Sequence, residues 1–141
     1  MADGEPNRRD AIDNDAYRKA EAFKEAYLGV EFSQAAQERG LARFPEWQDI
    51  SVRTVWGEIW SRPVLDVRTR SLCTIAALVA LDRQPEQRIH MRGALRAGVT
   101  RAELDEVVIQ MAIYAGWPVI ASALRNVEEV AEVLGGQAPD G

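Results

Sequence analysis

The chain has 141 residues, which suits one domain with a single core. It carries 22 acidic and 17 basic side chains, for a formal charge of −5, and no basic run long enough to follow a nucleic acid backbone, so a nucleic acid partner is excluded. A single cysteine excludes an internal disulfide, and no apolar signal segment is visible, so we expect a cytoplasmic protein. The longest apolar run, residues 72–81, is about half of the roughly 20 residues that cross a bilayer, which excludes a membrane protein.

Helical patterns fill the chain between two polar ends. Residues 1–13 and 135–141 contain glycine, proline and charged side chains, so we expect flexible termini around one helical domain at residues 14–134. The first helix is expected from residue 14 to Gly29, because its alanines and aromatic residues share one face. A weaker helix is expected at residues 33–39.

The middle of the chain has clear helix starts. Pro45 suits a first helical turn, where its missing N–H has no partner, and this helix is expected to stop at Pro63. Asp66 can cap the next helix, whose second half is apolar on every side. Such a helix must be covered all round, which favours burial against another subunit. Pro85 opens a shorter helix that Gly98 ends.

The best-marked boundary lies at Thr100. Glu103 follows three residues later as a capping box, and Val99 and Leu104 are placed as a hydrophobic staple. The helix runs to Gly116, and a last helix is expected from Pro118 to Leu134. Since no strand pattern occurs, the predicted fold class is all-α, a compact bundle of about six helices.

The only histidine, His90, is a candidate general acid or base, because imidazole titrates near neutrality. Glu86 lies four residues earlier, on the same helical face, where its carboxylate can fix the imidazole tautomer or share its proton. The alternative is an ordinary surface pair worth a few tenths of a kcal/mol.

Three arginines, Arg62, Arg68 and Arg70, precede the apolar helix. A guanidinium binds a carboxylate at two points, so one or two of them can hold an anionic substrate. They can equally be solvated charges, although the helix macrodipole disfavours cations at a helix start.

Further candidates are aromatic or adjoin aromatic residues. Glu58 lies between Trp56 and Trp60, where desolvation would raise its pKa unless the side chain points outward. Tyr114 and Trp117 flank a helix break and either line a pocket or form a plain helix corner.

Resident metal and cofactor sites are not expected. Cys73 and His90 are separated by 16 residues and lack the clustered spacing of metal ligands, and no glycine-rich phosphate loop is present. Cys73 is expected to pack as a small hydrophobe, with a nucleophilic role as the alternative.

Several motifs in the same order resemble the carboxymuconolactone decarboxylase family, in particular its decarboxylase branch. They are W-G-E-I-W-S-R-P at residues 56–63, T-R-S-L-C-T-I-A-A-L at 69–78, E-x-x-x-H at 86–90, G-V-T-R-A-E-L at 98–104 and Y-A-G-W-P at 114–118. The resemblance covers residues 46–134. It implies the all-helical, alkylhydroperoxidase D-like fold, assembly as a homotrimer or homohexamer, and a lyase of aromatic catabolism. The implied reaction is cofactor-independent decarboxylation of a carboxylated γ-lactone or a related carboxylic acid.

Roles follow from the resemblance and the chemistry together. We assign His90 as proton donor, Glu86 as its orienter and Glu58 as a second acid. Arg62 and Arg70 are expected to anchor the carboxylate that remains or the developing oxyanion, and Trp56, Tyr114 and Trp117 to line the pocket.

Two departures from the family pattern bear on function. The peroxidase branch has a C-x-x-C pair where this chain has Arg83 and Glu86, so thiol peroxidase chemistry is not expected. The first 45 residues match the decarboxylase branch poorly, and Leu95-Arg96-Ala97 replaces a segment often containing two asparagines. Two alternatives stay open: a tailoring enzyme of secondary metabolism acting by decarboxylation, cyclisation or isomerisation, and a non-catalytic helical assembly module.

Overall fold

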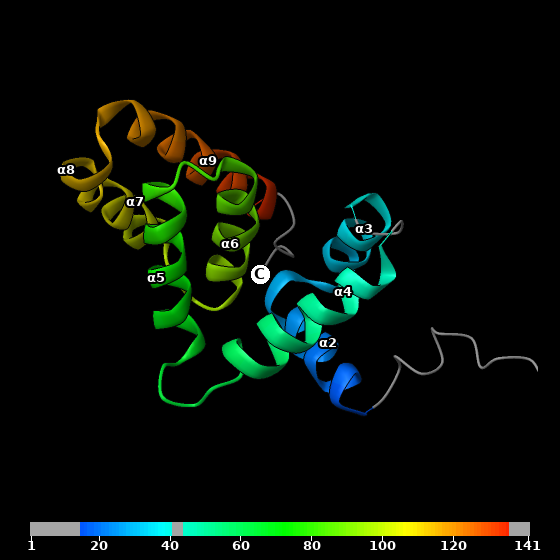
Figure 1. Cartoon of the computed structure of the whole chain (residues 1–141). Coiled ribbons are helices and arrows are strands. Elements are labelled where there is room, and N and C mark those ends of the chain that lie inside the picture. Colours follow the sequence, from blue (N-terminus) through cyan, green and yellow to red (C-terminus); the bar gives the residue numbers. More distant parts are fainter. Residues whose placement is uncertain (1–14, 41–43, 136–141) are drawn as a thin grey trace, which may run out of the picture. The chain divides into compact units, whose positions relative to one another are not determined.

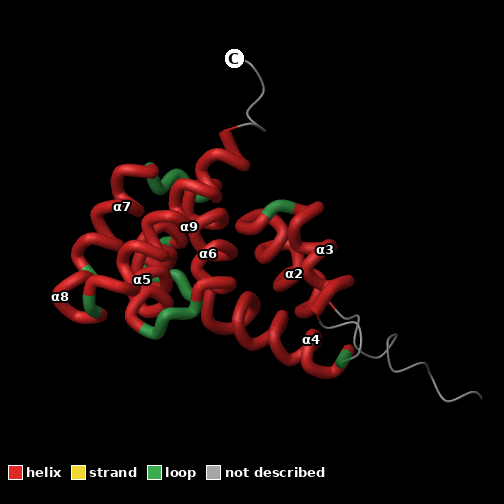
Figure 2. The backbone as a smooth tube through the Cα atoms, turned by 90° about the horizontal axis from the view of Figure 1, so that it is seen from above, coloured by secondary structure: helices red, strands yellow, loops and turns green. Residues whose placement is uncertain are grey.

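The structure is a computed structural model that describes residues 15–40 and 44–135, and every regular element in these ranges is a helix (Figures 1 and 2). The predicted all-α class is confirmed. The expected flexible end at residues 1–13 and the expected helix start at residue 14 lie outside the described residues, as does the expected flexible end at residues 135–141 except for Gly135, which is the last residue of a helix. The chain divides between Val64 and Leu65 into two compact units. The prediction of one domain over residues 14–134 stays a prediction.

The N-terminal unit begins with α2 (Asp15–Leu28), which ends before Gly29 as expected. Gly29 has a φ of 94°, a left-handed conformation that glycine adopts without strain. Its carbonyl accepts a hydrogen bond from Ser33 N at 2.9 Å, so α3 (Val30–Gly40) starts directly after the turn. The predicted start at residue 33 was therefore three residues late.

Pro45 opens the next helical segment as expected, in α4 (Pro45–Ser51). The helix then changes its winding and continues as η1 (Val52–Trp60), a π-helix of nine residues. The sequence predicted a single helix as far as Pro63, and the change to i→i+5 hydrogen bonding was not foreseen.

Aromatic rings fill the interface between α2 and η1. The ring of Tyr27 lies 5.6 Å from that of Trp56 and 4.8 Å from that of Trp60, and the two indoles are 5.2 Å apart. All three residues are buried. These separations and the tilted planes are favourable for aromatic pairs, so the cluster stabilises the contact between the two helices.

The C-terminal unit begins with α5 (Val67–Ala80), which is capped as predicted: Asp66 Oδ1 accepts a hydrogen bond from Thr69 N at 2.7 Å. A short turn leads to α6 (Gln84–Arg96). Gly98, with a φ of 88°, ends α6 in a Schellman motif, in which Val99 N donates to Ala94 O at 3.0 Å.

The capping box at Thr100 is present and starts α7 (Arg101–Gln110). Val99 and Leu104, the predicted staple, are both buried. The expected continuous helix to Gly116 is divided at Met111, whose N–H is shared between the carbonyls of Val107 and Val108.

Beyond this division, the short α8 (Ala112–Ala115) ends at Gly116, as predicted, and α9 (Trp117–Gly135) follows. Helices α5, α6, α7 and α9 enclose the core of the C-terminal unit, whose buried members are Ile75, Val79, Met91, Ala94, Val99, Leu104, Val108, Ala112, Ile120, Ala123, Val127 and Val130. No helix among the described residues is long and apolar enough to cross a bilayer.

Candidate functional site

Helix α6 carries the proposed acid–base pair on successive turns. Glu86 is exposed, whereas His90 is largely buried and its Nδ1 is shielded from solvent. Burial lowers the pKa of His90 from 6.5 to about 4, and the charge of Glu86 offsets part of that effect. The imidazole is therefore neutral at pH 7.

The position of His90 follows from the amphipathic pattern of α6. Gln87, Met91 and Ala94 recur at the spacing of one helical stripe, and all three are completely buried. His90 lies beside this stripe on the side that also carries Glu86, as 3.6 residues per turn require. The helix thus places its imidazole at the margin of the core and its carboxylate in solvent.

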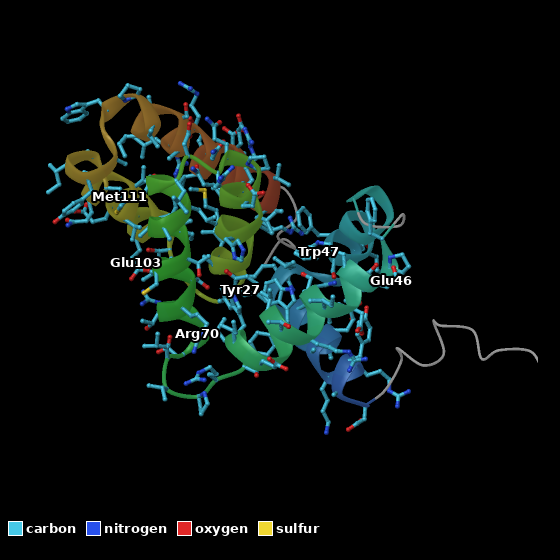
Figure 3. All side chains as sticks on the ribbon, viewed as in Figure 1. Tyr27, Glu46, Trp47, Arg70, Glu103 and Met111 are labelled. Atoms are coloured by element: carbon cyan, nitrogen blue, oxygen red, sulfur yellow. The ribbon has the colours of Figure 1, made fainter. Side chains whose placement is uncertain are left out.

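The arginines of α5 have different surroundings. Arg68 forms an ion pair with Glu103, the capping-box residue of α7. Arg70 is partly buried, and its Nη2 lies 3.5 Å from Leu65 O; Figure 3 shows it in the first half of α5. Of these two guanidiniums, Arg68 thus holds the starts of α5 and α7 together.

Helices α5 and α6 run antiparallel, and one hydrogen bond defines their register. Gln87 Nε2 donates to Leu78 O at 3.2 Å, so these two residues lie at the same height. Counting from that pair, Arg70 lies about five residues, or about 7 Å along the axis, beyond the level of His90. The Arg70 guanidinium is directed the other way along α5, with Nη2 3.5 Å from Leu65 O.

A pocket of about 460 Å³ lies in the N-terminal unit between α2 and η1. The rings of Phe23 and Trp56 contribute to its wall, and Lys19, Arg53 and Glu58 bring charged groups to it. Two of the predicted site residues, Trp56 and Glu58, therefore share one pocket. Its volume is in the range of small-molecule sites.

The two cations at this pocket are each paired with an acid, Lys19 within α2 and Arg53 with a residue of α4. Lys19 Nζ lies 2.8 Å from Asp15, in a pair exposed to solvent. Arg53 Nε lies 2.6 Å from Asp49 in a more buried pair. Glu58 is exposed, which answers the open question of its orientation: it points outward from the aromatic cluster.

The other predicted residues lie at the surface. Arg62 is exposed just after η1. Its backbone N–H donates a hydrogen bond to Ile59 O at 3.3 Å. Tyr114 and Trp117 are 71% and 78% exposed at the corner of α8 and α9. Cys73 is also exposed, so the expectation that it packs as a small hydrophobe was wrong.

Some residues of interest were missed from the sequence. Lys19 and Arg53 carry no motif and come to the pocket only through the packing of α2 against η1. Gln87 offered a signal, because it is an amide in the same helical stripe as Met91 and Ala94. No group of three or more histidine, cysteine or acidic side chains that could hold a metal ion occurs in residues 15–40 and 44–135.

Comparison with known proteins identifies the fold and the reaction class. The sequence pattern of the carboxymuconolactone decarboxylase family matches residues 45–129. The chain belongs to the carboxymuconolactone decarboxylase family. The all-α, alkylhydroperoxidase D-like fold implied by its motifs is the fold of this family.

Two relatives have assigned activities. A 4-carboxymuconolactone decarboxylase of Acinetobacter baylyi is 46% identical over 90 residues, which cover 64% of this chain and 67% of the relative. A nitrosuccinic acid decarboxylase of Metarhizium robertsii is 33% identical over 97 residues, covering 69% and 68%. An uncharacterised 15.0 kDa protein of Paracoccus denitrificans is 35% identical over 77 residues, covering 53% of this chain and 58% of that protein. This member of the family is a carboxy-lyase.

Proposed function

We propose that the enzyme decarboxylates a small carboxylic acid whose departing electron pair is accepted by a conjugated electron-withdrawing group, with a 4-carboxymuconolactone-like γ-lactone as the first candidate. The 46% identity to a 4-carboxymuconolactone decarboxylase carries this proposal. The largely buried imidazole on α6 supports it, because decarboxylation of this kind needs a proton donor to carbon.

The chemistry needs no external electron sink. When the bond from the ring carbon to the carboxylate breaks, its electron pair spreads into the unsaturated lactone as a dienolate, and carbon dioxide leaves. The enzyme must then stabilise the oxyanion and deliver one proton to carbon. Each preorganised donor to such an oxyanion contributes roughly 10²-fold to 10³-fold in rate.

His90 supplies the proton in two steps. The free imidazole is neutral at pH 7, but the negative charge of a bound substrate raises its pKa, as the charge of Glu86 already does. Substrate binding therefore favours uptake of a proton from solvent onto His90. After carbon dioxide leaves, the imidazolium gives this proton to carbon and becomes neutral again.

The arginines hold the part of the substrate that stays. Arg70 binds the retained carboxylate or the oxyanion, with Arg62 as the second candidate. A guanidinium on the departing carboxylate would stabilise the ground state more than the transition state and so slow the step. The departing group is therefore expected to face apolar side chains.

A second substrate is favoured by the relative from Metarhizium robertsii, a nitrosuccinic acid decarboxylase. In nitrosuccinate, the nitro group accepts the electron pair and becomes a nitronate. In the lactone, the unsaturated ring accepts it and becomes a dienolate. The two acids share the activated carboxyl carbon and a second carboxylate, and both are substrates that the same residues can serve.

The test is incubation of the full chain with each acid separately, without added metal or nucleotide, while carbon dioxide release is measured. Release from the lactone, at a rate well above the uncatalysed reaction, is the expected result. Release from nitrosuccinate alone would replace the first candidate with the second. If folded protein releases no carbon dioxide from either acid, the proposal is contradicted.

A further inference from the structure

Two amides lie inside the largely apolar core of the C-terminal unit. Gln87 of α6 has no exposed surface, and Asn126 of α9 is 1% exposed. Burying such groups is costly unless they form hydrogen bonds with one another or with the backbone. Their presence next to the proposed acid–base residues on α6 therefore calls for a physical reason.

The two amides form a directed chain of hydrogen bonds across three helices. Gln87 Nε2 donates to Leu78 O at the end of α5, and Asn126 Nδ2 donates to Gln87 Oε1 at 2.9 Å. The orientation is self-consistent, because a backbone carbonyl can only accept and so must face the NH₂ group of Gln87. The oxygen of Gln87 then faces the NH₂ group of Asn126. One side chain thereby ties α6 to both α5 and α9.

Helix geometry links this anchor to the proposed site. With 3.6 residues per turn, His90 lies about 60° around α6 from Gln87, and Glu86 lies about 100° away on the same side. A turn of α6 by one residue position would therefore either bring Glu86 to the core or carry His90 into solvent. Burial of Met91 and Ala94 sets which face of α6 is inside, and the hydrogen bonds of Gln87 add a fixed distance and direction to that contact.

We propose that the Gln87–Asn126 pair is a positioning element that fixes the rotation of α6 and so holds the His90 ring at the margin of the core. The catalytic consequence rests on the proposed function, whereas the placement of the ring does not. Amides suit this role because their hydrogen bonds are directional, whereas the apolar contacts around them are not. Hydrogen bonds demand a distance and an angle, so they restrict small rotations that apolar packing alone tolerates.

The central test replaces both amides with apolar groups of similar size, in the double variant Gln87→Met with Asn126→Leu. Removing both partners avoids a buried orphan amide, and Leu78 O keeps its other hydrogen bond, from Arg83 N at 2.9 Å. His90 is the only histidine, so its imidazole resonances can be followed in NMR without overlap. We expect its pKa to rise by about one unit or more as the ring gains water. We also expect kcat to fall on the order of tenfold to a hundredfold, with helicity and cooperative unfolding retained.

The matched control removes a surface link between the same two helices. Arg88 Nε lies 3.0 Å from Glu129, in an exposed ion pair between α6 and α9. The double variant Arg88→Ala with Glu129→Ala should leave the His90 titration and kcat at the parental values. A shift as large as that of the amide variant would mean that any link between α6 and α9 suffices, which would overturn the proposal.

A measurement on the unaltered chain keeps the proposal testable if the amide variant does not fold. The side-chain NH₂ protons of Gln87 and Asn126 should exchange with solvent as slowly as core backbone amides. Rapid exchange would overturn the proposal, as would a folded amide variant with a parental His90 titration. A shifted titration with unchanged kcat would retain the structural role and overturn the catalytic one. A shifted titration in a protein that releases no carbon dioxide from either acid would count against the proposed function alone.

Discussion

Gly57 of η1 and Ala20 of α2 approach so closely that a β-carbon at Gly57 would lie 3.1 Å from the Ala20 Cβ. The methyl of Ala20 belongs to a helix and cannot swing aside, so any side chain at Gly57 must push α2 and η1 apart. The aromatic cluster of Tyr27, Trp56 and Trp60 lies between the same two helices. Glycine in the W-G-E-I-W motif therefore permits the close packing on which the N-terminal unit depends.

The variant Gly57→Ala should lower the free energy of unfolding by about 1 kcal/mol, because overpacking outweighs the helix propensity gained from alanine. In the Ala20→Gly background the same change should cost less, since the opposing methyl is gone. Denaturant unfolding of both single variants and the double variant gives the coupling energy. Strictly additive effects would show that the two positions do not press on each other.

The capping box of α7 should matter more to stability than the ion pair attached to it. Thr100→Ala removes the acceptor for Glu103 N, a bond of 3.2 Å, and should cost about 1 kcal/mol. Arg68→Ala removes a partly exposed partner of Glu103 and should cost less than about 1 kcal/mol. Thermal and denaturant unfolding check the order, and a larger loss for Arg68→Ala would reverse it.

Boundaries set by local chemistry could be predicted from the sequence. Asp66 and Thr100 cap helices through their own side chains, and Gly98 and Gly116 adopt positive φ where a helix must end. These signals need only a few neighbouring residues. They therefore locate helix ends without knowledge of the tertiary structure.

Features that depend on packing could not be predicted. The change to π winding at Val52 accompanies the stacking of Trp56 and Trp60 on Tyr27, a residue of another helix. The break between α7 and α8 at Met111 likewise has no glycine or proline from which it could be predicted. In both places, the sequence pattern of a continuous amphipathic helix was satisfied.

The candidate site was predicted by residue type but not by environment. The spacing of Glu86 and His90 placed them on one helix face, and the structure agrees. The lowered pKa of His90 comes from burial, which periodicity does not reveal for a residue at the edge of a stripe. The exposure of Tyr114 and Trp117 could not be predicted from the sequence either, since both residue types occur in pockets and at surfaces.

Stability should fall with decreasing pH in a window set by His90. The unfolded chain binds its proton near pH 6.5 and the folded chain only near pH 4, so the unfolded state is favoured progressively between these values. Above pH 6.5 the contribution is complete, and the difference between the two pKa values corresponds to about 3 kcal/mol. The free energy of unfolding of the parent, relative to that of His90→Gln, should fall by up to about 3 kcal/mol as the pH is lowered from about 7.5 to about 4. Parallel curves would show that the ring is not buried in solution.

Substitution at His90 should affect turnover, and substitution at Arg70 should affect binding. His90→Asn removes the proton carrier and should lower kcat on the order of a hundredfold. Arg70→Ala should chiefly raise KM, because it removes a contact made in both ground and transition states. Steady-state kinetics with the acid that proves active separate the two effects.

The control for these kinetics is Cys73→Ser, a change at an exposed thiol of α5 that the proposed reaction does not use. Its kcat and KM should equal those of the parent. A loss of activity in this variant would reopen a nucleophilic role for the thiol. Parental turnover by a folded His90→Asn protein would contradict the proton-donor role.

The corner of α8 and α9 should form a contact between subunits. Ile113, Tyr114 and Trp117 are 79%, 71% and 78% exposed, which is unusual for neighbouring large apolar side chains of a protein without a partner. We therefore expect the parent to sediment as a homo-oligomer and Trp117→Arg to shift it to smaller species. Val133→Arg, at a 56% exposed position further along α9, serves as the matched control and should keep the parental mass. A monomeric parent, or an unchanged mass for Trp117→Arg, would show that this corner is ordinary solvent-exposed surface.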